Sequence, residues 1–344
     1  MNDYYTLKVK EVVKETDDAV TLRFKQPIFK KIKYQSGQFL TLIFNIDGIK
    51  SRRSYSMCST PSLDSTIDVT VKRVEGGLVS NYINDHITEG SSVEVMQPMG
   101  LFTFEPDKSK SRHIVLWGAG SGITPLMSIM KSVLFFEPES KVSLVYGNRT
   151  EDSIIFKDKL DILKERFGDR LQVVHVLSRP DHTWGGYSGR IDDIKVVNIM
   201  NKLPKMEEAR HFLCGPEGLM ESVKTGLKTL RVSNSSIHYE SFVPKQDAVA
   251  EDISTHKVKV ILDGEEDEFT VTPDKTILEA GLDEGLDLPY SCQSGVCTAC
   301  RGKCISGKVQ MTEHDALSED EIKQGYVLTC QSHPMTDNVV IEMG

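Results

Sequence analysis

Four of the seven cysteines stand at a spacing that could bind a pair of iron atoms. Cys292, Cys297 and Cys300 follow the pattern C-x4-C-x2-C, and Cys330 comes thirty positions later. A [2Fe–2S] cluster needs four thiolates, and this pattern supplies three from one loop and the fourth from a distant anchor. A structural zinc site is the alternative, but zinc favours two paired C-x2-C motifs and the chain has one. We therefore predict an iron–sulfur cluster held by these four residues.

A glycine-rich stretch upstream could approach a phosphate group. Gly118-Ala-Gly120-Ser-Gly122-Ile-Thr124-Pro125 follows the apolar run 114–117 and precedes a helical segment, 126–134. Glycines here let a pyrophosphate reach the backbone and the positive end of the helix, and Pro125 suits a first helical turn. The pattern G-x-G-x-G differs from the dinucleotide fingerprint G-x-G-x-x-G, so a plain glycine turn is the alternative.

Hydrophobic patterns divide the chain into three regions. Residues 1–105 alternate with a period of two, which is typical of an antiparallel barrel or sandwich. From about residue 111, short continuous apolar runs alternate with helical segments, which indicates a parallel sheet covered by helices. Residues 256–344 contain a hairpin-like pair of strands and a short helix, which predicts a small α+β domain stabilised by its metal centre.

Composition and charge exclude several classes of protein. The chain has 344 residues, of which 39% are hydrophobic, so it is long enough for two or three folded domains. Its net charge of −9 argues against a general nucleic-acid-binding surface. Residues 256–344 hold 7 Lys and Arg against 17 Asp and Glu, and this acidic excess suits either docking to a basic partner or simple solvation. We see no export signal and no membrane span, and expect a cytoplasmic protein in a reducing compartment.

The cysteine motif and two barrel motifs resemble known families. Residues 256–344, with Leu288-Pro-Tyr-Ser291 before the first ligand, resemble a plant-type ferredoxin domain of the β-grasp fold. Arg53-Ser54-Tyr55-Ser56, followed by Gly76-Gly77-Leu78-Val79-Ser80, resembles the flavin-binding barrel of the ferredoxin–NADP reductase superfamily.

That resemblance implies a flavin site in the first region. Arg53 would pair with the flavin pyrophosphate, Tyr55 would lie against the isoalloxazine, and Ser56 would bond near flavin N5. A guanidinium, an aromatic face and a hydroxyl suit these roles physically. FAD is preferred over FMN, which one branch of the superfamily uses. The other residues expected to contact the flavin are Ser54, Val71, Lys72, Gly77, Leu78, Val79 and Ser80.

The second region resembles the nicotinamide domain of the same superfamily. The glycine-rich stretch, Tyr146-Gly-Asn-Arg149, Cys214-Gly215-Pro216 and Glu240-Ser-Phe242 occur in the family's order. The family places Thr124 and Cys214 near the nicotinamide, Gly215 and Pro216 around its pocket, and Phe242 against both rings, although Phe242 could be plain core.

We expect Ser56, Cys214 and Glu240 to be the catalytic residues. Arg149 could suit a 2′-phosphate and favours NADPH over NADH, while the nearby Glu151 and Asp152 oppose it.

The order of the three regions resembles the reductase components of bacterial multicomponent oxygenases. Within them, Val71-Lys-Arg-Val-Glu-Gly-Gly, Gln97-Pro-Met-Gly100 and Cys214-Gly-Pro-Glu217 are most similar to the reductase subunits of phenylacetyl-CoA epoxidases, which serve a di-iron oxygenase. The resemblance implies electron flow from NAD(P)H through FAD and the [2Fe–2S] cluster to an iron-containing oxygenase. The alternatives are a stand-alone NAD(P)H oxidase or quinone reductase, a redox sensor, and a reductase of another hydroxylase, desaturase or steroid oxygenase.

We accordingly expect a multidomain protein with four segments. They are an FAD-binding antiparallel β-barrel (1–106), an NAD(P)-binding α/β domain with a parallel sheet (107–243), a linker (244–255) and a plant-type [2Fe–2S] ferredoxin domain (256–344).

Overall fold

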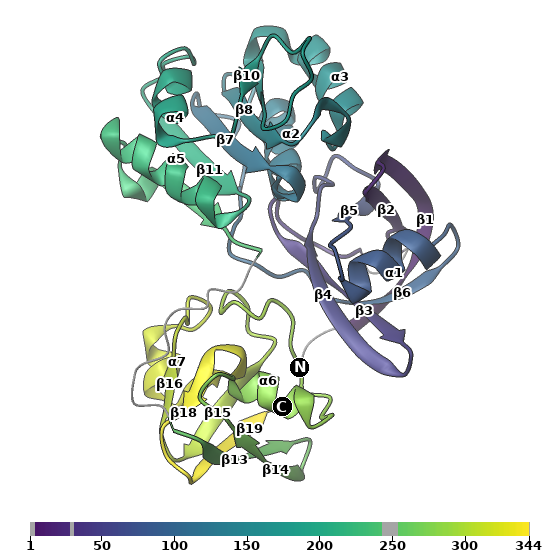
Figure 1. Ribbon diagram of the computed structural model, residues 1–344, viewed down its shortest axis with the longest axis vertical. Helices are drawn as coiled ribbons and strands as arrows, with labels where there is room; N and C mark the ends of the chain where they lie inside the picture. The colour runs from purple at the N-terminus through teal and green to yellow at the C-terminus, as the bar shows by residue number, and fades with distance from the viewer. Residues whose placement is uncertain (1–3, 28–30, 243–253, 344) are drawn as a thin grey trace.

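Three large sheets organise the described part of the chain, each in its own region of the sequence (Figure 1). The computed structural model describes residues 4–27, 31–242 and 254–343. Nearly all of the expected linker, 244–255, lies outside the described residues. An antiparallel sheet comes first, a parallel sheet second and a mixed sheet last, which confirms the predicted fold class.

The first sheet forms a barrel with a single helix. Its strand order is β4-β3-β6-β1-β2-β5, and an isolated bridge between Met57 and Val69 joins the two edges. The predicted alternation is present, because Leu22, Leu40 and Leu42 point into one buried core. The elements are β1 (Tyr4–Thr16), β2 (Ala19–Lys25), β3 (Phe39–Ile46), β4 (Ile49–Ser56), β5 (Thr66–Lys72), α1 (Leu78–His86) and β6 (Ser92–Met96).

The second sheet is parallel throughout, with strand order β10-β9-β8-β7-β11-β12. Its central strands are continuous apolar runs because helices cover both faces. The elements are β7 (His113–Ala119), α2 (Ile123–Phe136), β8 (Lys141–Asn148), α3 (Lys157–Phe167), β9 (Leu171–Leu177), β10 (Tyr187–Ser188), α4 (Asp193–Met200), β11 (Ala209–Cys214), α5 (Glu217–Thr229) and β12 (Ile237–Glu240).

The third region contains a five-stranded mixed sheet, β14-β13-β19-β15-β17, and a two-stranded one, β16-β18. The helix α6 begins with a capping box between Thr276 and Glu279, which explains where it starts. The elements are β13 (His256–Leu262), β14 (Glu265–Val271), α6 (Ile277–Asp283), β15 (Arg301–Ser306), β16 (Val309–Met311), α7 (Glu319–Lys323), β17 (Tyr326–Leu328), β18 (Ser332–Pro334) and β19 (Val339–Met343).

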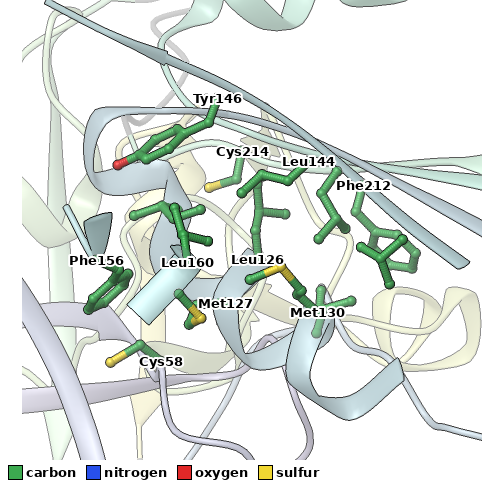
Figure 2. Close-up of a cluster of buried hydrophobic side chains, with 14 of the residues drawn as sticks. Cys58, Leu126, Met127, Met130, Leu144, Tyr146, Phe156, Leu160, Phe212 and Cys214 are labelled. Carbon is green, nitrogen blue, oxygen red and sulfur yellow. The ribbon is translucent and has the colours of Figure 1, made fainter. Parts of the chain in front are cut away.

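One hydrophobic core joins the barrel to the parallel sheet. Cys58 of the barrel lies in the same buried cluster as Met127 and Met130 of α2 and Phe212 of β11, and Figure 2 shows these side chains together. A separate cluster fills the ferredoxin-like region. None of the helices in the described ranges is both long and apolar enough to cross a membrane.

We expect the buried ion pair between Arg112 and Glu137 to be a main support of the α/β domain. Both side chains are at most 4% exposed, and Arg112 Nη2 donates to Glu137 Oε1 over 2.6 Å. Arg112→Leu should destabilise the domain by about 3–5 kcal/mol, because it leaves a buried carboxylate without its cation. Urea unfolding followed by circular dichroism measures the change. Lys164→Gln, which removes an exposed pair with Asp161, is the matched control and should leave the midpoint unchanged. Equal midpoints for both variants would contradict the assignment.

Candidate functional site

Three elements bring the expected catalytic residues together. Ser56 ends β4, Cys214 ends β11 and Glu240 ends β12; Ser56 and Cys214 are buried, and Glu240 is partly buried. Cys214 pairs with Glu240 across the two parallel strands. The Ser56 hydroxyl donates to Glu240 Oε2 over 3.2 Å, so the barrel and the α/β domain touch at this point. Residues 184 positions apart therefore form one polar group at the carboxyl edge of the sheet.

Burial shapes the acid–base chemistry of this group. It raises the pKa of Glu240 from its usual 4.5 to about 8, although the hydrogen bond from Ser56 opposes the rise. Burial also raises the pKa of Cys214 well above 9, and the neighbouring Glu240 adds to that effect. Cys214 is accordingly a neutral thiol at pH 7, while Glu240 can exchange a proton near neutral pH.

A cavity of about 270 Å³ opens beside Glu240 at the junction of all three regions. The barrel contributes Leu101 to Thr103, the α/β domain contributes the strand that ends in Glu240, and the ferredoxin-like region contributes Ser294, Val296, Glu313 and Asp315. Glu240 thus lies between the flavin motif and the cysteine loop.

The barrel strand β4 presents Arg53 and Tyr55 of the flavin motif on one face and Ser54 of the motif on the other. Arg53 and Tyr55 share a face by strand alternation, with Arg53 exposed and the Tyr55 ring half-buried against the barrel core. Arg52 and Ser54 lie on the opposite face. The Ser54 hydroxyl contacts Thr41 and Ser291, so its side chain is turned toward the cysteine loop.

The second part of the flavin motif surrounds the start of α1. Gly77 caps this helix, and a Cβ atom there would lie only 2.6 Å from Ser80 Oγ, so the turn has no room for a side chain. Leu78 is exposed and Val79 is buried. The side chain of Val71 lies in the barrel core, and Lys72 pairs with Asp18, so these two offer a ligand mainly their backbone. The bare N–H groups at a helix N-terminus suit a phosphate.

The glycine-rich stretch forms a tight turn between β7 and α2. Gly120 has φ +54°, and a Cβ atom on Gly122 would lie 2.0 Å from the Cys214 carbonyl oxygen. Close packing of the chain against itself therefore demands glycine at 122 regardless of any ligand. Thr124 donates back to the Ser121 carbonyl and Pro125 lies in the first turn of α2, as the sequence predicts.

The other predicted nucleotide residues lie along the same carboxyl edge. Gly215 packs against Ala119 and Leu219, and Pro216 precedes α5. Arg149 is exposed just after β8, and its carbonyl accepts a hydrogen bond from the backbone of Arg179, just after β9. Phe242 is 45% exposed, so it does not belong to the core.

The four cysteines of the C-terminal region lie within contact of one another. Cys292 Sγ is 3.1 Å from Cys297 Sγ, and Cys330 contacts both Cys292 and Cys300. Hydrogen bonds from Cys297 and Cys330 lower the pKa of Cys292, which favours the thiolate that binds iron. The backbone N–H of Ser294 donates to Cys292 Sγ over 3.4 Å.

The loop from Cys292 to Cys300 and the distant Cys330 supply the four thiols that two irons need. Four linked thiols that divide between two irons fit a [2Fe–2S] cluster, and the N–H group aimed at sulfur fits its negative charge.

Sequence reasoning missed the residues that join the cysteine loop to the barrel. Arg52 is only 3% exposed and lies 2.8 Å from Asp287 of the ferredoxin-like region. Glu313 and Asp315, which line the cavity beside Glu240, were also missed. The sequence offers one indication of this contact: two adjacent arginines, Arg52 and Arg53, place a charged side chain on each face of β4.

Three family models match successive parts of the chain. The oxidoreductase FAD-binding domain matches residues 6–104, the oxidoreductase NAD-binding domain matches 116–225, and the 2Fe-2S iron-sulfur cluster binding domain matches 260–335. The predicted cofactors FAD, a nicotinamide nucleotide and a [2Fe–2S] cluster are thereby confirmed.

Similar proteins extend over the whole chain. A component of the 1,2-phenylacetyl-CoA epoxidase of Escherichia coli K12 is 38% identical over 99% of this chain and 98% of its own length. The ferredoxin reductase component of 3-ketosteroid-9-alpha-monooxygenase from Rhodococcus rhodochrous is 37% identical, with 98% and 96% covered. The structure of phthalate dioxygenase reductase has the same fold, with a TM-score of 0.63, 24% identity and 99% and 98% covered. The chain therefore belongs to the family of NAD(P)H-dependent reductase components of multicomponent oxygenases, which carry FAD and a [2Fe–2S] cluster.

Proposed function

We propose that this reductase takes hydride from NADPH and delivers single electrons to an iron-containing oxygenase of the phenylacetyl-CoA epoxidase type. The observation that carries the proposal is the contact of Ser56 with Glu240 next to the cysteine loop, because it brings residues from the nicotinamide, flavin and cluster regions to one point. The similarity to the epoxidase component from Escherichia coli over nearly the whole chain supports the choice of partner. Seven cysteines without a disulfide suit the reducing cytoplasm.

The barrel residues would hold FAD, which supplies a two-electron acceptor that can release its electrons one at a time. Arg53 binds the pyrophosphate as a guanidinium fork, and the N–H groups from Gly77 to Ser80 bind it from the helix end. Tyr55 would offer its aromatic face to the ring system, and Ser56 would offer its hydroxyl to the reactive edge. Ser54, Val71 and Lys72 contribute backbone contacts.

The α/β domain would hold the nucleotide along its carboxyl edge. Gly118, Gly120 and Gly122, with Thr124 and Pro125, receive the pyrophosphate at the start of α2. Cys214, Gly215 and Pro216 would shape the nicotinamide pocket, and the exposed Phe242 would be available to cover the ring. These residues would orient the nicotinamide toward the flavin site, and orienting two reactants in this way makes a reaction effectively unimolecular.

Arg149 and Arg179 together account for a preference for NADPH. Their backbones are hydrogen-bonded at the ends of adjacent strands, so two cations lie where the adenosine ribose reaches in parallel-sheet nucleotide sites. We expect Arg149→Ala and Arg179→Ala each to raise KM for NADPH by about tenfold, because a charge-assisted bond to phosphate contributes about 1.5–3 kcal/mol. KM for NADH serves as the internal control and should stay within about twofold. Equal effects on both nucleotides would rule out a 2′-phosphate site.

Glu240 would accept the proton that must leave the reduced flavin when electrons pass to the cluster. The carboxyl ionises near pH 8, so its proton-accepting form increases from pH 7 to 9. We expect the rate of electron transfer from flavin to cluster to rise over this range and the rise to disappear in Glu240→Gln. Stopped-flow absorbance measures this step. Asp315→Asn, which lines the same cavity, is the control that should keep the profile. A Glu240→Gln enzyme with the original pH dependence would remove Glu240 from this role.

Cys292, Cys297, Cys300 and Cys330 would ligate the cluster, and its loss should separate the two halves of the reaction. We expect Cys297→Ser to abolish electron delivery to cytochrome c and to a purified epoxidase oxygenase component, while NADPH still reduces the flavin. Cys304→Ser changes a partly buried cysteine outside the motif and should retain both activities. Equal loss of both activities in Cys297→Ser would mean that the order of the centres is wrong.

An unaltered rate of NADPH oxidation in air, with or without a partner, would indicate a stand-alone oxidase.

A further inference from the structure

The outer face of the strand pair β3–β4 is covered by the segment that leads into the cysteine loop. Asp287 to Ser291 immediately precede the first ligand, Cys292, and every polar side chain in this segment contacts the barrel. Barrel residues Phe39 and Ile43 also lie in one buried cluster with Cys297 and Ala299.

Arg52 makes the densest set of these contacts. Its Nη2 lies 2.8 Å from Asp287 Oδ1, its guanidinium lies 5.0 Å from the centre of the Tyr290 ring, and its backbone N–H donates to the Tyr290 hydroxyl over 3.4 Å. Lys50 Nζ lies 2.9 Å from the other oxygen of Asp287. A guanidinium that stacks on an aromatic ring and binds a carboxylate cannot be replaced by an ordinary hydrogen-bond donor.

Burial of Arg52 depends on the ferredoxin domain. The side chain stands on the outer face of the barrel and yet is only 3% exposed, because the partners that enclose it belong to 287–290. Asp287 itself is 54% exposed, so the ion pair is open to salt from one side. Beside it, Thr41 Oγ1 and Ser291 Oγ are 2.5 Å apart.

We propose that Arg52 and Asp287 form a docking clamp that positions the cysteine loop against the flavin barrel and thereby sets the rate of electron transfer from flavin to cluster. This inference rests on the electron order proposed above. Hydride transfer would leave two electrons and one proton on the flavin. The electrons would pass singly, each reducing one ferric iron of the cluster to ferrous iron that the oxygenase reoxidises before the next, and the one proton would leave once per electron pair, through Glu240 as proposed above. Arg52 and Asp287 are positioning residues, since they act only through the distance between the two centres.

Docking can be measured without any turnover. The Thr41 and Ser291 hydroxyl oxygens are 2.5 Å apart, so cysteines introduced at both positions would carry neighbouring sulfur atoms. Disulfide formation in the double variant Thr41→Cys, Ser291→Cys therefore reports whether the domains are docked. The full-length double variant is incubated anaerobically with oxidised glutathione, and the disulfide is followed by peptide mass spectrometry. Flavin and cluster absorbance verify that both groups are retained.

We expect Arg52→Gln to slow formation of this disulfide about tenfold, because the loss of one partner weakens a charge-assisted interdomain contact. Asp287→Asn, which changes the other domain, should also slow disulfide formation. Arg52→Lys should give a rate between those of the parent and Arg52→Gln. High salt should slow the disulfide in the parent and change it little in Arg52→Gln. The matched control is Arg23→Gln, because Arg23 pairs with Glu11 and Asp68 within the barrel.

The rates of electron transfer complete the test. In Arg52→Gln without engineered cysteines, we expect flavin reduction by NADPH to stay within twofold and flavin-to-cluster transfer to fall about tenfold. In Arg52→Gln that also carries Thr41→Cys and Ser291→Cys, formation of the disulfide should restore flavin-to-cluster transfer. Reduction of the disulfide should slow the transfer again. An unchanged rate of disulfide formation in both Arg52→Gln and Asp287→Asn would overturn the proposal. A disulfide that forms in Arg52→Gln without restoring electron transfer would also overturn it. Failure of the parent to reduce its cluster would refute the electron order instead, since the disulfide reports docking independently.

Discussion

Successive side chains of a β-strand point to opposite sides, and the organisation of this reductase depends on how β4 uses that rule. Arg53 and Tyr55 lie on the face assigned to the flavin, while Arg52 and Ser54 face the segment that enters the cysteine loop. One strand of eight residues therefore faces the proposed flavin site on one side and the segment that leads into the cysteine loop on the other. Because the strand is held in register by β3 from Phe39 to Ile46, neither face can move without the other.

A second constraint is the burial of a carboxyl group at the junction. Isolating Glu240 from water costs free energy, and the hydrogen bond from Ser56 offsets only part of it, so the group stays protonated until about pH 8. A fully exposed glutamate would ionise near 4.5 and could neither hold nor exchange a proton at neutral pH. The placement that is costly for folding also gives the residue the pKa that the proposed proton transfer requires.

Much of the architecture could be predicted from local patterns. Period-two alternation predicted the barrel, continuous apolar runs predicted the parallel sheet, and C-x4-C-x2-C predicted the cluster loop, because each pattern reflects contacts within one domain. The covering of β3 could not be predicted in this way. Phe39, Thr41 and Ile43 are buried on the face that alternation assigns to solvent, since a domain some 250 residues later lies on them. Likewise, the glycines suggested a phosphate site, but nothing local indicated that Gly122 must pack against Cys214.

Fusion of the ferredoxin domain to the reductase explains why so few interdomain contacts suffice. A tethered domain stays at an effective concentration of about millimolar, so docking need not supply the free energy of bringing two separate proteins together. One half-exposed ion pair, a few hydroxyl contacts and a small apolar cluster fit that requirement. A larger hydrophobic interface would hold the domain permanently, with Cys297 against the barrel and unavailable to an external acceptor. A polar contact of this size fits the proposed clamp, which must position the cluster loop without the area of a permanent interface.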